Sequence, residues 1–101
     1  MTLEEILAAA AADTSLDAGR GTDGGLTWSV GDVVFATLDA GGMVASFRLD
    51  PVLAGAARRT PDTRASARGD AWVEFAPGVV DAHAEDRARA WFMAAARRAE
   101  G

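Results

Sequence analysis

Four arginines, Arg58, Arg59, Arg64 and Arg68, are the side chains of this sequence best suited to recognition chemistry. A guanidinium group presents a planar fork of N–H donors that matches the oxygens of phosphate and carboxylate groups. One hypothesis is therefore that this stretch forms a modest anion-binding or partner-binding patch. The interpretation that we favour is that the four are scattered solubilising charges beside Asp62 and Asp70.

Few other residues suit metal binding. His83 is the only histidine and there is no cysteine, whereas a zinc site needs several Cys, His or carboxylate ligands at workable spacing. Glu4, Glu5 and Asp13 could form an acidic ridge that attracts iron, but we favour the interpretation that they are a plain solvated helix face. We expect no metal and no cofactor.

The sequence also lacks the patterns of nucleophilic catalysis. Ser29, Ser46 and Ser66 fall within expected strands, without a Gly-x-Ser-x-Gly turn to expose a hydroxyl and without a histidine nearby in sequence. The glycines at 19, 21, 24 and 25 precede a strand rather than a helix and have no lysine beside them, unlike a phosphate-binding loop. We expect a protein that is not an enzyme.

Length and charge narrow the class further. A chain of 101 residues predicts a single domain, residues 1–101. The net charge of −5 disfavours avid binding to nucleic acid, although residues 57–101 alone carry eight arginines. No stretch approaches the ~18 apolar residues of a membrane helix. The acidic start MTLEEILAAAAAD is unlike a signal peptide, and the lack of cysteine fits a cytoplasmic protein.

Capping signals and hydrophobic periodicity place the elements that must position these residues. Thr2 and Glu5 have the capping-box spacing, and a helix is expected over residues 3–12. Residues 13–25, rich in Gly, Asp, Ser and Thr, predict a long mobile loop. Alternation then predicts strands at 26–30, 33–38 and 43–49, a helix at 51–59, strands at 63–67 and 71–75, and a final helix at 81–99.

These elements can bury their apolar faces only against each other. We therefore predict a two-layer α+β fold, with a five-stranded antiparallel sheet, three helices packed on one face and the other face partly open. Large apolar residues are scarce beside the 24 alanines. For this reason we expect Trp28, Trp72 and Trp91 in the core, although strand tryptophans can also stack bases in single-strand binders.

The segment WSVGDVVFATLDAGGMVASFRLDP, with Asp70-Ala71-Trp72-Val73 and the last helix bearing Trp91, resembles the MmcQ/YjbR family. The likeness covers about residues 26–97, and residues 30–36 are its most specific part. Two departures stand out. Val33 replaces the usual lysine, and the glycine-rich loop replaces a Leu-Pro-Gly after the first helix. The resemblance implies a frataxin-like or secretion-chaperone-like α+β domain, and members of the family are often labelled DNA-binding.

These observations favour a small cytoplasmic, bacterial, non-enzymatic binding or interaction domain. Its partner would be an unknown protein or small-molecule ligand, with no membrane association. The alternative, which the family label implies, is DNA binding through the arginine-bearing second half.

Overall fold

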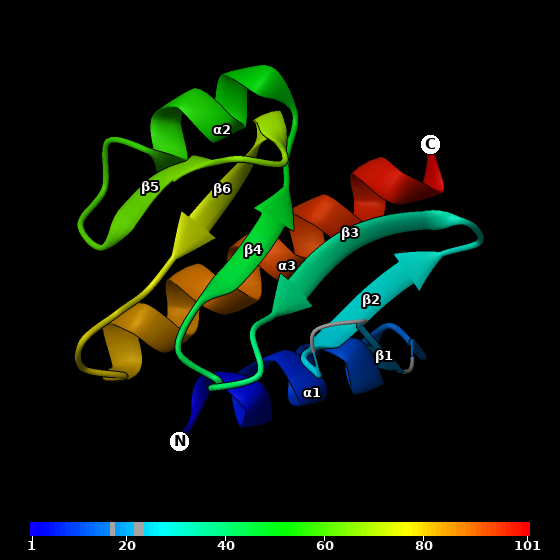
Figure 1. The fold of residues 1–101 in the computed structure, drawn as a ribbon, viewed down its shortest axis with the longest axis horizontal. Coiled ribbons are helices and arrows are strands. Elements are labelled where there is room, and N and C mark those ends of the chain that lie inside the picture. The colour runs from blue at the N-terminus through cyan, green and yellow to red at the C-terminus, as the bar shows by residue number, and fades with distance from the viewer. Residues whose placement is uncertain (17, 22–23) are drawn as a thin grey trace.

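A computed structural model describes residues 1–16, 18–21 and 24–101 of the chain. Three helices and an antiparallel sheet form an α+β fold, as predicted (Figure 1). The elements in chain order are α1 (Leu3–Asp13), β1 (Gly19–Arg20), β2 (Leu26–Val30), β3 (Val33–Leu38), β4 (Ala45–Arg48), α2 (Pro51–Ala57), β5 (Thr63–Ser66), β6 (Gly69–Phe75) and α3 (Ala82–Glu100). The strand order across the sheet is β1-β2-β3-β4-β6-β5.

The predicted number of strands was wrong, because the sheet has six and not five. The additional strand, β1, lies inside the segment predicted to be a loop. Gly19 pairs with Thr27 and Arg20 with Leu26, so β1 covers part of the free edge of β2. A two-residue strand of glycine and arginine has no apolar alternation, and alternation is the signal by which strands are found in a sequence.

Helix α1 begins with the predicted capping box. The Thr2 hydroxyl accepts from the Glu5 amide, and the Glu5 carboxylate accepts from the Thr2 amide at 2.9 Å. The hydrogen bond from the Thr2 backbone amide, and after it the nearby Thr2 hydroxyl, lower the pKa of the Glu5 carboxyl. The ionised Glu5 carboxylate therefore stabilises the folded state at pH values above the pKa that Glu5 has in the unfolded chain. This contribution to folding is lost as the pH falls through the lower pKa of the folded state.

Two tight connections set the register of the central strands. Gly31, with φ of 58°, lies in the two-residue link between β2 and β3, where a residue with a side chain would be strained. Between β3 and β4, one carboxylate oxygen of Asp39, Oδ1, accepts from the amides of Met43 and Val44 at 2.8 and 3.0 Å. Because this turn includes Met43, the strand predicted over residues 43–49 begins only at Ala45, and the Met43 side chain is exposed.

The helices gather on one side of the sheet. Figure 1 shows α1 and α3 behind the strands. The buried side chains of α3 include Ala88, Trp91, Phe92 and Ala95. Helix α2 is joined to the edge of the sheet through Thr63 of β5, whose hydroxyl donates to the Ala57 carbonyl at 2.8 Å. The sheet therefore has a covered face and an open face.

Aromatic rings fill the space between the sheet and α3. Phe92 packs edge-on against Trp28 and Phe35, with ring centroids 5.7 and 5.2 Å away. Trp91 packs edge-on against Phe75 at 5.2 Å. Alanines supply much of the remaining contact surface, among them Ala10 and Ala11 of α1 and Ala84, Ala88, Ala95 and Ala96 of α3. Small side chains at these positions allow the helices to approach closely.

The prediction that all three tryptophans lie in the core was wrong for Trp72. Trp28 and Trp91 are buried, whereas Trp72 is half-buried. On β6, Val73 and Phe75 are fully buried, so the alternation of the strand turns Trp72 toward the open face. The guanidinium of Arg68 lies over its ring, with Cζ 5.2 Å from the ring centroid.

Within the described residues, no helix combines the length and apolar character needed to span a bilayer.

Candidate ligand groove on the open sheet face

A row of polar side chains crosses the open face of the sheet from strand to strand. The register pairs Thr27 with Thr37, Thr37 with Ser46, Ser46 with Glu74, and Glu74 with Arg64. These five residues therefore stand side by side on β2, β3, β4, β6 and β5. We call them the polar row. Their neighbours along the strands, such as Phe47 and Val73, point into the core.

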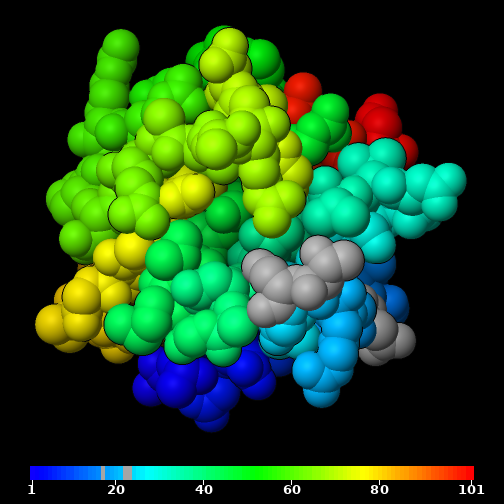
Figure 2. Space-filling model, viewed as in Figure 1, coloured from blue at the N-terminus to red at the C-terminus, as the bar shows by residue number. Residues whose placement is uncertain are grey.

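The polar row forms the floor of a groove of about 460 Å³. Figure 2 shows this face hollowed between the β5–β6 hairpin and the central strands. Besides the five polar residues, the groove is lined by Gly21, Leu26, Val34, Leu38, Asp39, Val44 and Arg68. In Figure 1, α1 and α3 lie behind the strands, on the side of the sheet away from the groove.

Two hydroxyl groups at the centre of the groove lack hydrogen-bond partners. Thr37 and Ser46 are only 7% and 6% exposed, yet neither side chain makes a hydrogen bond with any described residue. Neither hydroxyl is among the fully buried side-chain atoms that lack a partner in the described residues, which are Trp28 Nε1 and Arg87 Nε, so both oxygens remain accessible from the groove. By contrast, the hydroxyl of Thr63 donates to the carbonyls of Ala57 and Thr60, both at 2.8 Å.

This contrast gives a test on stability. Thr37→Val should leave the free energy of unfolding unchanged within ~0.5 kcal/mol or raise it, because no hydrogen bond is lost. Thr63→Val, the matched control, should lower it by about 1 kcal/mol, since the one hydroxyl proton that the Ala57 and Thr60 carbonyls share is lost. Urea denaturation of both variants makes the measurement. A loss for Thr37→Val as large as that for Thr63→Val would show that the Thr37 hydroxyl serves the fold.

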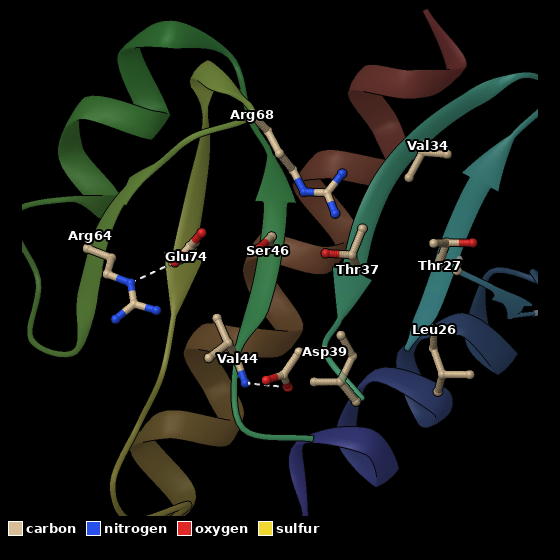
Figure 3. Close-up of a pocket in the computed structure, with 12 residues that line it drawn as sticks. Leu26, Thr27, Val34, Thr37, Asp39, Val44, Ser46, Arg64, Arg68 and Glu74 are labelled. Atoms are coloured by element: carbon tan, nitrogen blue, oxygen red, sulfur yellow. Dashed lines mark hydrogen bonds and ion pairs between the residues drawn. The ribbon is translucent and has the colours of Figure 1, made fainter. Parts of the chain in front are cut away.

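Charge is unevenly distributed along the groove. On β5, Arg64 is neutralised by Glu74, whose Oε1 lies 2.6 Å from the Arg64 Nε. Arg68, in the β5–β6 turn, forms no ion pair with any acid that the structure describes. Arg48 pairs in register with Trp72 and also has no acidic partner among these residues. Asp39 supplies a carboxylate at the opposite end (Figure 3).

The structure divides the four arginines that the sequence placed in one patch. Arg64 and Arg68 line the groove. Arg58 instead donates to the backbone carbonyl of Asp70 at 3.0 Å, which ties the end of α2 to β6. Arg59 is exposed and does not line the groove. The sequence thus placed two of its four candidates at the groove, but it did not single out the threonines or Ser46.

The remaining candidates lie elsewhere. His83 is exposed in the first turn of α3 and lines neither the groove nor a second hollow beside Met1 and Met43. Ser29 and Ser66 are half-buried in β2 and β5. Asp13 forms an ion pair with Arg89. Among residues 1–16, 18–21 and 24–101, no three His, Cys, Asp or Glu side chains gather closely enough to hold a metal ion.

Comparisons with known proteins identify a shared fold. No family model matches the chain, and no curated protein is similar to it in sequence. Among solved structures, it is similar to the crystal structure of a protein from Pseudomonas syringae that was a target of the Northeast Structural Genomics Consortium. The TM-score is 0.71 at 13% identity, over 98% of this chain and 99% of that chain. At this identity the likeness concerns the fold alone.

Proposed function

We propose that this chain is a small, non-enzymatic binding domain of the MmcQ/YjbR type that holds a small polar ligand in the groove of its open sheet face. The observation that carries the proposal is the pair of unpartnered hydroxyls on Thr37 and Ser46. A side chain that contributes no hydrogen bond to the fold is available to contribute one to a ligand. The volume of about 460 Å³ falls within the range of small-molecule sites.

Binding fits the groove better than catalysis does. None of the residues that line it is a histidine, the usual general base for a serine or threonine nucleophile. The carboxylate beside Ser46 in register, Glu74, is already engaged by Arg64. The floor consists of strand residues, which hold their side chains in fixed positions and suit recognition. We propose a cytoplasmic location, in keeping with the absence of cysteine from the sequence.

The proposal can be tested by amide chemical-shift mapping on the full chain. A panel of organic acids, phosphate monoesters, sugars and neutral amides would be added in turn to ¹⁵N-labelled protein. We expect some compounds to shift the amides of Thr37, Ser46 and Glu74 and to leave Ala88 and Ala95 of α3 unmoved. The double variant Thr37→Val with Ser46→Ala should weaken this binding roughly tenfold or more. Shifts confined to another surface, or none, would refute the proposal.

DNA binding is the second candidate, and one observation favours it. Arg68 lies over the half-buried Trp72, with Arg48 beside Trp72 in register, and strand aromatics with arginines are features of single-strand binders. The net charge of −5 opposes it. Titration with single-stranded and duplex DNA at two salt concentrations separates the candidates. Micromolar binding that weakens steeply with salt would favour DNA, and no binding at low salt would exclude it.

A further inference from the structure

We infer that the ligand of the groove carries an oxyanion, a carboxylate or phosphate group, which Arg68 binds together with the hydroxyls of Thr37 and Ser46. This inference rests on the proposed function and specifies the chemistry of its ligand. It differs from a general arginine patch because only one arginine, Arg68, and two neutral hydroxyl groups recognise the ligand.

The first observation is the direction of Arg68. Arg68 is an exposed residue of the β5–β6 turn, but its guanidinium group does not point away from the protein. Figure 3 shows the group reaching back over β4 toward Ser46 and Thr37, and its Cζ lies 5.2 Å from the centre of the Trp72 ring. Stacking on the ring occupies one face of the guanidinium and leaves its in-plane N–H donors available for a ligand.

The second observation is the local charge. Arg64 is compensated by Glu74, whereas Arg68 and Arg48 have no acidic partner among the described residues. Arg48 does not line the groove but lies beside Trp72 in register. Arg68 therefore brings an uncompensated positive charge to the groove, in a chain whose net charge is −5. An anion bound there gains a charge-assisted hydrogen bond without displacing an existing ion pair.

The third observation concerns the donors beside that charge. Thr37 and Ser46 are more than nine-tenths buried, and each presents a hydroxyl that bonds to no described residue. A guanidinium fork and two hydroxyls can together satisfy several lone pairs of a carboxylate or phosphate. The Asp39 carboxylate at the far end disfavours a second anionic group there. The ligand is thus a small molecule with one oxyanion and a neutral or donor-bearing remainder.

Matched pairs of compounds test this directly. Glycerol 3-phosphate would be compared with glycerol, and propionate with propionamide, at constant ionic strength, by the same amide mapping and by tryptophan fluorescence. We expect the phosphate, the carboxylate or both to shift Thr37 and Ser46, and the neutral partners to have no effect. Because Trp28 and Trp91 are buried, the fluorescence change should come from Trp72 and disappear in Trp72→Phe.

Substitutions locate the cation. Arg68→Gln should weaken oxyanion binding roughly tenfold or more, whereas Arg59→Gln, an exposed arginine outside the groove, should leave it unchanged. A preference for phosphate over carboxylate, or the reverse, would identify the source of the oxyanion. The inference would be overturned if the neutral compounds bound as strongly as the anions, or if oxyanion binding survived Arg68→Gln. Either result would still support the proposed function, a ligand-binding groove. If no compound shifts the groove, both proposals fall.

Discussion

Replacing Phe92 with alanine is expected to lower the free energy of unfolding by about 3–5 kcal/mol, the usual cost of deleting a buried aromatic ring. The Phe92 side chain is 0% exposed and joins α3 to two strands through edge-on contacts with Trp28 and Phe35. A domain of this size has a stability of about 5–15 kcal/mol, so the loss consumes much of it. The midpoint of thermal unfolding should fall by roughly 15–30 °C, as measured by circular dichroism.

Two further variants make this prediction decisive. Phe92→Leu preserves most of the volume and should cost less than about 1.5 kcal/mol, which keeps the test usable if the alanine variant does not fold. Val79→Ala removes an apolar side chain that is 74% exposed and should change stability by less than ~0.5 kcal/mol. Equal losses for Phe92→Ala and Val79→Ala would contradict the packing described for α3.

Replacing Arg87 with glutamine is expected to cost about 2 kcal/mol, the second largest loss. Its guanidinium lies over the rings of Phe75 and Trp91, with Cζ 4.8 and 5.9 Å from the ring centroids. Its Nη1 also donates to the Pro61 carbonyl at 2.8 Å, which fastens the α2–β5 connection to α3. The buried Nε without a described partner offsets part of this gain. Urea denaturation of the variant gives the measurement.

Arg89, two residues further along α3, is the matched control. It forms an ion pair with Asp13 of α1, and the two side chains are 45% and 52% exposed. Pairs on the surface contribute about 0–1 kcal/mol, because water already solvates both charges. Arg89→Gln should therefore cost less than Arg87→Gln, and the small loss should shrink further at high salt. The reverse ranking would show that the stacking of Arg87 on the rings contributes little.

Most of the fold follows from local signals in the sequence. Thr2, Asp50 and Asp81 cap the three helices as their residue types predict, and alternation located five of the six strands. The one strand that sequence reasoning missed is defined by its pairing with a neighbouring strand. The strand β1 exists only because β2 lies beside it, and no property of Gly19 or Arg20 alone indicates this.

The groove was less predictable than the fold. Thr27, Thr37 and Ser46 can be assigned to the outward face of their own strands, but their alignment depends on turn geometry and on a bulge at Trp28 and Ser29. The error at Trp72 has a similar origin. Its size and apolar character favour burial, yet its position between Ala71 and the buried Val73 turns it outward, where Arg68 covers it.

The alanine-rich contacts on the covered side have a consequence for divergence within the fold. Where Ala88 and Ala95 are buried at 0% exposure, a larger side chain would force the layers apart, so these sites tolerate little change. The polar row is less restrained, because its side chains line the groove and do not fill the contact between the sheet and the helices. Proteins with this fold could therefore differ at these five positions, and under the proposed function in their ligand, without having to rebuild the interior.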